Sequence, residues 1–208
     1  MTNQRFIRAL LGSLLLALPS AWLLQAAETP ASFQLDASSF RCMRDMTPVR
    51  HFYVDNLAGN LDGTLAAANA PEGAIYPVGS VVQLVPTEVM VKRDSGFSPV
   101  TGDWEFFELE VSADGSKIHK RGFADVNNRF DGNCFGCHVP AKQKWDFICE
   151  QDHGCEPIPI THAMTGALQR SDPRCGEPQL QSGDSWQLFK LKSMVVIGSV
   201  VKTVKGWF

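Results

Sequence analysis

Apolar and polar residues alternate along the middle of the chain in a way that predicts short β-strands joined by tight turns. The β-branched and aromatic residues in these runs suit half-buried strands, and Asp114 with Gly115 is typical of a hairpin turn. Because the connections are too short for crossovers, we expect an antiparallel sheet. The predicted strands cover residues 49–54, 80–85, 88–92, 104–111 and 117–123.

Helical patterns are weaker. Residues 57–69 place three leucines at helical spacing, although Gly59 and Gly63 disfavour a helix, and Thr161 can cap a second helix. The segment 188–208 is apolar and carries four lysines without an acidic residue. Its valines are β-branched, so we expect a β-rich closing segment there rather than a helix lying on a membrane surface.

The first residues have the layout of a secretory signal peptide. Arg5 and Arg8 precede an apolar run over 9–24, and Ala26 and Ala27 offer small residues for cleavage. The run is short for a retained membrane anchor. Cleavage after Ala27 leaves 181 of the 208 residues and changes the formal charge from −3 to −5. We therefore expect a periplasmic or otherwise exported protein in an oxidising compartment.

Composition excludes several classes of protein. With 44% hydrophobic and 20% charged residues, the chain can bury a core and is not a disordered tail. The negative net charge argues against binding to nucleic acid, and by the same reasoning gives no cause to expect binding to anionic lipid. Six cysteines are more than a cytosolic chain of this size usually carries.

The strongest chemical signal is the sequence CFGCH at residues 134–138. The C-x-x-C-H pattern is the attachment motif of c-type haem, in which two thiols bind the porphyrin and the histidine ligates the iron. We therefore predict one covalent haem c, held by Cys134 and Cys137, with His138 as the proximal iron ligand. A thioredoxin-like redox pair would need a βαβ context, and a zinc site would need further regularly spaced ligands.

The four other cysteines are expected to form structural disulfides. Four cysteines allow three connectivities. We favour the local pair Cys149 with Cys155, which leaves Cys42 to pair with Cys175 and to tie the start of the mature chain to its carboxyl-terminal region.

The sixth iron ligand decides between functions, and no residue has a spacing that demands ligation. A lone methionine is more often core filling than a ligand, and a lone histidine is more often a surface residue. The candidates are Met43, Met46, Met90, Met164, Met194, His51, His119, His153 and His162.

Several segments occur in an order that points to a known family. They are VRHFYVDN at 49–56, YPVGSVV at 76–82, VKRDSGFSPVTGDWEFF at 91–107, CFGCH at 134–138, and then Lys142, Lys144 and Asp146. Over residues 47–148 the chain resembles the cytochrome P-460 and cytochrome c′-beta family. The resemblance implies a periplasmic, homodimeric, mainly antiparallel β fold with one haem c and a distal side open to small nitrogen species.

The same resemblance bears on distal residues. The hydroxylamine-oxidising members crosslink a lysine to the porphyrin, and that position is Leu84 here, which cannot form the bond. Arg50 matches a distal arginine of those enzymes, although a surface strand charge explains it equally well. Met46 falls where some relatives place an aromatic cap. Phe106 and Phe107 lie on opposite faces of one strand, so at most one faces haem.

We predict an α+β fold, mainly antiparallel β-sheet with a few short helices around one covalently bound haem c. The expected function is binding of a small gas or nitrogen-oxide ligand such as NO at an open distal site. The alternatives are an electron-transfer cytochrome with a methionine ligand and a redox partner protein, or a hydroxylamine-oxidising enzyme using Arg50. The predicted parts are a signal peptide (1–27), an irregular lead-in (28–46), the haem domain (47–150) and a cysteine-containing extension (151–208).

Overall fold

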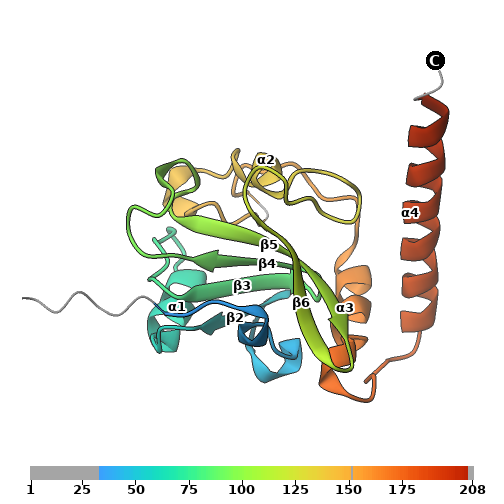
Figure 1. Cartoon of the computed structure of the whole chain (residues 1–208), viewed down its shortest axis with the longest axis horizontal. Coiled ribbons are helices and arrows are strands. Elements are labelled where there is room, and N and C mark those ends of the chain that lie inside the picture. Colours follow the sequence, from blue (N-terminus) through green and yellow to red (C-terminus); the bar gives the residue numbers. More distant parts are fainter. Residues whose placement is uncertain (1–32, 151, 206–208) are drawn as a thin grey trace, which may run out of the picture. The chain divides into compact units, whose positions relative to one another are not determined.

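Six antiparallel strands form one sheet whose spatial order follows the chain from β1 to β6 (Figure 1). The computed structural model describes residues 33–150 and 152–205, with side chains described as far as residue 196, so the predicted signal peptide lies outside the described residues. The sheet and the helices around it confirm the predicted α+β class. The strands are β1 (Thr47–Val49), β2 (Phe52–Asn56), β3 (Ser80–Val85), β4 (Glu88–Lys92), β5 (Trp104–Ser112) and β6 (Gly115–Gly122).

The prediction of a single strand over 49–54 is wrong. The chain instead makes a tight hairpin between β1 and β2, and Arg50 adopts a left-handed backbone conformation at the turn (φ 52°). Val49 pairs with Phe52 across the hairpin, and both side chains are buried. The alternation of apolar and polar residues could not reveal the turn, because residues 49–52 contain no glycine, proline or asparagine that would mark a turn. The bounds of β3 and β4 agree with the prediction.

Within residues 33–150 and 152–205, four α-helices and five short 3₁₀ helices complete the fold. Asn60, Asn133 and Thr161 cap α1, α2 and α3 through side-chain oxygens that accept backbone N–H groups, and Thr161 does so as predicted. The α-helices are α1 (Leu61–Ala68), α2 (Cys134–His138), α3 (His162–Arg170) and α4 (Asp184–Lys205). The 3₁₀ helices are Ala37–Ser39, Met43–Asp45, Pro99–Thr101, Gln143–Trp145 and Pro173–Cys175.

Helix α4 overturns the expectation of a β-rich carboxyl-terminal segment. Each valine costs a helix only a few tenths of a kcal/mol to about 0.7 kcal/mol, which tertiary contacts readily offset. Leu188, Leu191 and Met194 recur at helical spacing and pack with residues of α3. Asp184 at the first residue of the helix also pairs with Arg170 of α3, with nitrogen–oxygen distances of 2.7 Å.

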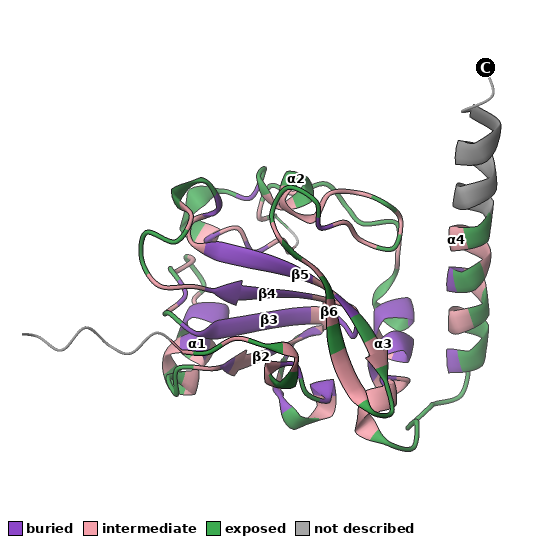
Figure 2. Ribbon diagram, viewed as in Figure 1, coloured by how far each residue is buried: buried purple, intermediate pink, exposed green. Residues whose placement is uncertain are grey.

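The sheet has an apolar cluster on each face, and the central strands β3, β4 and β5 are largely buried (Figure 2). One face carries Trp104 and Phe106 and is covered by α1 and the segment around α2. The other face carries Phe107 and is covered by the lead-in, where Phe107 and Phe40 lie 5.0 Å apart between ring centroids. The predicted division of Phe106 and Phe107 between opposite faces is confirmed.

Both predicted disulfides are present, Cys42–Cys175 and Cys149–Cys155. Disulfides persist in oxidising compartments, so they support an exported environment. Among residues 33–150 and 152–205, no helix combines the length and hydropathy needed to cross a bilayer.

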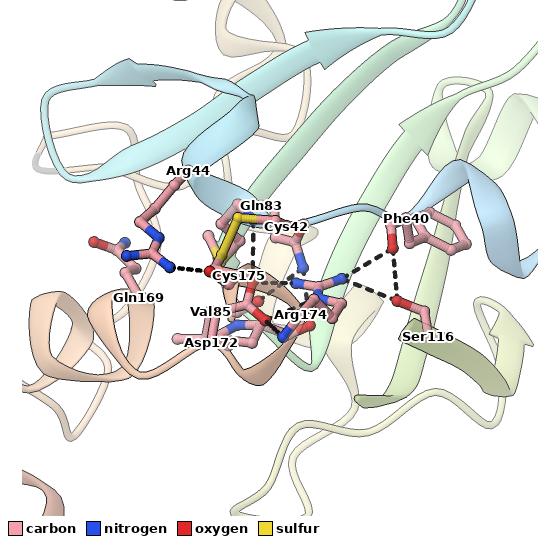
Figure 3. Close-up of polar contacts among 12 residues, drawn as sticks. Phe40, Cys42, Arg44, Gln83, Val85, Ser116, Gln169, Asp172, Arg174 and Cys175 are labelled. Atoms are coloured by element: carbon pink, nitrogen blue, oxygen red, sulfur yellow. Dashed lines mark hydrogen bonds and ion pairs between the residues drawn. A yellow bond between two sulfur atoms is a disulfide. The ribbon is translucent and has the colours of Figure 1, made fainter. Parts of the chain in front are cut away.

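A buried polar network surrounds the Cys42–Cys175 bond (Figure 3). The fully buried Asp172 carboxylate accepts the Met43 N–H at 3.0 Å and two guanidinium donors of Arg174 at 2.7 and 2.9 Å. Arg174 also donates to the Phe40 carbonyl at 3.3 Å and to the Ser116 hydroxyl at 3.1 Å. These contacts fasten the extension to the lead-in and to β6, so the extension is an integral part of the fold.

Candidate cofactor site

A cavity of about 1160 Å³ lies against the face of the sheet that carries Phe106. It exceeds the roughly 300–1,000 Å³ typical of sites for small organic ligands, and so has room for a larger group. The sheet contributes apolar side chains from β3, β4 and β5, and helix α2 forms one wall. Residues 149–150 and 152–161, which belong to the loop closed by Cys149 and Cys155 (the disulfide loop) and to the extension, form another. Residues that are far apart in the sequence therefore meet at one site.

Helix α2 brings the CFGCH motif to this cavity. Cys134, Cys137 and His138 all line it. The Asn133 side chain accepts the Gly136 N–H at 2.7 Å and starts the helical turn, and a Cβ on Gly136 would lie 3.3 Å from the Asn133 oxygen. Cys134 and Cys137 are free thiols, whereas the other four cysteines are paired. The two thiols are thus available for attachment chemistry.

His138 is oriented by a backbone carbonyl. Its Nδ1 lies 2.6 Å from the Phe147 oxygen, and a proton on Nδ1 makes this a hydrogen bond that leaves Nε2 as the atom able to ligate a metal. Burial lowers the pKa of His138, which favours the neutral imidazole that metal ligation requires. The ring packs edge-on against Phe106 at 5.3 Å between centroids. This arrangement of an anchored histidine is typical of a ligand.

The carbonyl that holds His138 is itself fixed to the sheet. Asp146 and Phe147 both have left-handed backbone conformations, with φ of 48° and 64°. The Asp146 carboxylate accepts the Lys92 ammonium at 2.8 Å on each oxygen, while its backbone carbonyl accepts the Trp104 indole N–H at 2.8 Å. Burial raises the pKa of Asp146, and Lys92 opposes that shift. Lys92 is therefore a structural residue behind the site rather than one of its lining residues.

The cysteine pair does not resemble a redox or zinc site. Burial raises the pKa of the Cys134 thiol to about 12, so at neutral pH it is not the thiolate that thiol exchange uses. Helix α2 follows a loop, not a parallel strand of a βαβ unit. Within the part of the chain that the structure describes, no three His, Cys, Asp or Glu side chains converge to hold one metal ion.

Arg50 lines the cavity and pairs with Glu150 of the disulfide loop. The Arg50 Nε donates to Glu150 at 2.7 Å, a second guanidinium nitrogen also contacts this carboxylate, and it donates to the Ala68 carbonyl at 2.8 Å. Glu150 raises the pKa of Arg50, so the guanidinium stays charged. Arg50 makes these contacts from the left-handed turn between β1 and β2. Arg50 is thus a wall residue with a specific acidic partner.

Two histidines meet beside that ion pair. The rings of His51 and His162 lie 4.3 Å apart between centroids, and both residues line the cavity. Burial, followed by the neighbouring His162, lowers the pKa of His51. A third histidine, His153, lines the cavity from the disulfide loop and stacks on Trp145 at 3.9 Å.

Some of the other predicted residues line the cavity, and others lie elsewhere in the fold. Leu84 and Met90 line the cavity, so an apolar side chain stands at the position where the resemblance places a crosslinking lysine. Met46 packs with Phe40 in the cluster on the opposite face and is not positioned as a cap. Of the nine candidate sixth ligands, those that line the cavity are Met90, His51, His153 and His162.

Sequence reasoning missed the roles of Phe147 and Glu150. The Phe147 role is a backbone contact, which leaves no pattern in side-chain types. Glu150 follows Cys149 in the sequence. The predicted Cys149–Cys155 disulfide was therefore the one sequence signal that drew attention to the segment containing Glu150. No protein-family model, characterised protein or solved structure matches the chain, so the site is interpreted from its own chemistry.

Proposed function

We propose that this protein is an exported mono-haem c-type cytochrome with an open distal site for small nitrogen species such as NO. One observation carries the proposal. A single helical turn presents two free thiols and a histidine to a large cavity, and that histidine has its Nδ1 held by a backbone carbonyl. The three residues that the attachment motif requires therefore lie where a porphyrin has space.

The described residues fit such a group. Cys134 and Cys137 would bind its edge covalently, and Nε2 of His138 would be the proximal iron ligand. Phe106 packs on that histidine ring, and Val82 offers an apolar wall. When bound, the haem supplies an iron centre able to bind diatomic ligands and to exchange one electron. The chain's part is to orient the histidine and to place the apolar side chains of the sheet against the group.

Two further functions have support from particular residues. The Arg50–Glu150 pair offers a fixed positive charge and a carboxylate on the cavity wall, which favours proton handling as in a hydroxylamine-oxidising enzyme. Leu84 disfavours that reading because it cannot form the porphyrin crosslink. Met90 lines the cavity and could ligate the iron of an electron-transfer cytochrome. The homodimer and redox partner implied by the resemblance stay predictions.

Covalent attachment is tested by expressing the protein with export and haem-lyase machinery and staining a denaturing gel for haem. We expect the native chain to retain haem, and Cys134→Ala/Cys137→Ala to lose it. The matched control, Cys149→Ser/Cys155→Ser, also removes two cysteines and should retain haem. Loss of haem in the control but not in the first variant would refute the proposal, as would a native chain without haem.

Absorption spectra of the purified protein then separate the three functions. A high-spin ferrous spectrum that shifts on adding NO or CO supports the open site. A low-spin spectrum with a sulfur-to-iron charge-transfer band, lost in Met90→Ala, would replace it with the electron-transfer function. A broad, red-shifted ferrous band would signal a crosslinked haem and would overturn the reading of Leu84.

A further inference from the structure

Helix α4 has a second apolar face that the fold does not cover. Leu191 is buried against α3, but Trp186, Phe189 and Val196 are 59%, 58% and 61% exposed. The rings of Trp186 and Phe189 stack at 5.4 Å between centroids, one helical turn apart. Figure 2 shows exposed residues recurring along the described part of this helix. The helix therefore uses one side to join the fold and presents aromatic side chains on another.

Basic residues border this exposed face. Lys192 is exposed, and the Lys190 ammonium lies 5.9 Å from the centre of the Trp186 ring. The sequence adds Lys202 and Lys205 further along, and residues 185–208 contain no aspartate or glutamate. The rest of the chain has 15 basic residues against 22 acidic ones, a formal charge of −7. Positive charge is thus concentrated on this helix in an otherwise acidic protein.

We infer that the exposed face of α4 binds the surface of an anionic phospholipid bilayer. Tryptophan and phenylalanine enter the boundary between headgroups and acyl chains, while lysines reach anionic headgroups with their ammonium groups. Each lysine near such a surface strengthens binding about fivefold at physiological salt. The acidic remainder of the chain is repelled by the same surface, which favours contact through α4 alone. The inference departs from the expectation drawn from net charge, because net charge does not show where the charges lie.

A second copy of the chain fits this face less well. Pairing two α4 helices through their aromatic faces would bring the lysines of both copies together without an acidic partner. A lipid surface supplies the missing negative charge. The inference does not depend on haem, because every residue that carries it lies outside the cavity.

The test is sedimentation of the exported protein with vesicles of phosphatidylglycerol and phosphatidylcholine, compared with phosphatidylcholine alone. We expect binding to the anionic vesicles that weakens from 0.1 to 1 M salt. Lys190→Glu/Lys192→Glu should weaken it at least about tenfold, and Trp186→Ala/Phe189→Ala should also reduce it. The matched control, Ile75→Ala/Val100→Ala, removes apolar residues that are 64% and 63% exposed elsewhere and should bind normally.

Three outcomes would overturn the inference. One is native protein that does not sediment with anionic vesicles, and another is equal binding by the native chain and both α4 variants. The third is a dimer in analytical ultracentrifugation that Trp186→Ala/Phe189→Ala converts to monomer, which would assign the face to a second copy. All variants have the same amino terminus, so a difference in vesicle binding between the native chain and an α4 variant is caused by the substitutions in α4. Far-UV circular dichroism verifies that each variant is folded.

Discussion

The ion pair between Lys92 and Asp146 offers the sharpest test of how the fold supports the site. Both side chains are almost fully buried, and the Lys92 ammonium contacts both Asp146 oxygens at 2.8 Å. The perturbation is Asp146→Asn, which keeps the shape of the side chain and an oxygen for the Tyr76 N–H, now bound at 2.8 Å. It removes the negative charge and replaces the second oxygen, which accepts from Lys92, with an NH2 donor, and so leaves the Lys92 ammonium buried without a counter-ion.

The expected magnitude follows from that imbalance. Breaking a buried pair by removing one charge costs about 3–5 kcal/mol. We expect the lower end, because Lys92 keeps its hydrogen bond to the Gly102 carbonyl at 2.7 Å. Lys92→Met should cost a similar amount, since it strands the Asp146 carboxylate. The double variant, Lys92→Met/Asp146→Asn, holds no unpaired charge, so its free energy of unfolding should fall by only about 1–2 kcal/mol. Most of this loss comes from the Gly102 carbonyl, which no longer has a hydrogen-bond donor.

Urea unfolding at pH 7, followed by tryptophan fluorescence, measures these free energies. Trp104 is fully buried and lies 5.2 Å from the Lys92 ammonium, so its emission should report loss of this region. Glu72→Gln is the matched control, because its pair with Lys144 is exposed and 3.6 Å long and should contribute less than about 1 kcal/mol. A double variant as unstable as the sum of the two single variants would refute the reasoning.

Two further predictions concern the extension. Cys42→Ser/Cys175→Ser opens a loop 133 residues long and should lower the free energy of unfolding by about 5 kcal/mol. Cys149→Ser/Cys155→Ser opens a much shorter loop and should lower it by about 2 kcal/mol. Equal losses of the two variants in urea unfolding would contradict the loop-closure explanation. Ion pairing lowers the pKa of Asp184 to about 2 from its usual 3.8, so its stabilising contribution is complete above pH 4 and is lost as the pH falls towards 2. Urea midpoints of the native chain and Asp184→Asn should therefore differ at pH 5 and converge near pH 2, and a constant difference would exclude the ion pair as the cause.

The sheet was predictable because its strands are short, alternating and joined by close turns. The bounds of β3 and β4 agreed with the pattern, and Asp114 with Gly115 marked the hairpin before β6. The β1–β2 hairpin was missed because an arginine makes the left-handed turn, which sequence statistics do not anticipate. Helix α4 was missed because β-branching is a local preference, whereas packing against α3 decides the structure.

The candidate cofactor site was predictable only where its residues are close together in the sequence. The two thiols and the histidine proposed for haem attachment lie within five positions, so CFGCH forms a pattern that can be recognised directly. The Arg50–Glu150 and His51–His162 contacts join residues about 100 positions apart, so they depend on how the extension returns to the sheet. Gln169 of α3 fixes that return by donating to the His51 and Leu84 carbonyls at 2.8 Å.

The Cys42–Cys175 bond also constrains the order in which the protein matures. A chain emerges amino end first, and Cys175 is the last of the six cysteines. Cys42 therefore remains an unpaired thiol while the segment with Cys134 and Cys137 is synthesised. Cys149 and Cys155, in contrast, are synthesised almost together. Any chain that ends before residue 175 leaves Cys42 without its partner and open to capture by the thiols of the CFGCH motif. Correct pairing of Cys42 thus depends on synthesis being completed as far as residue 175.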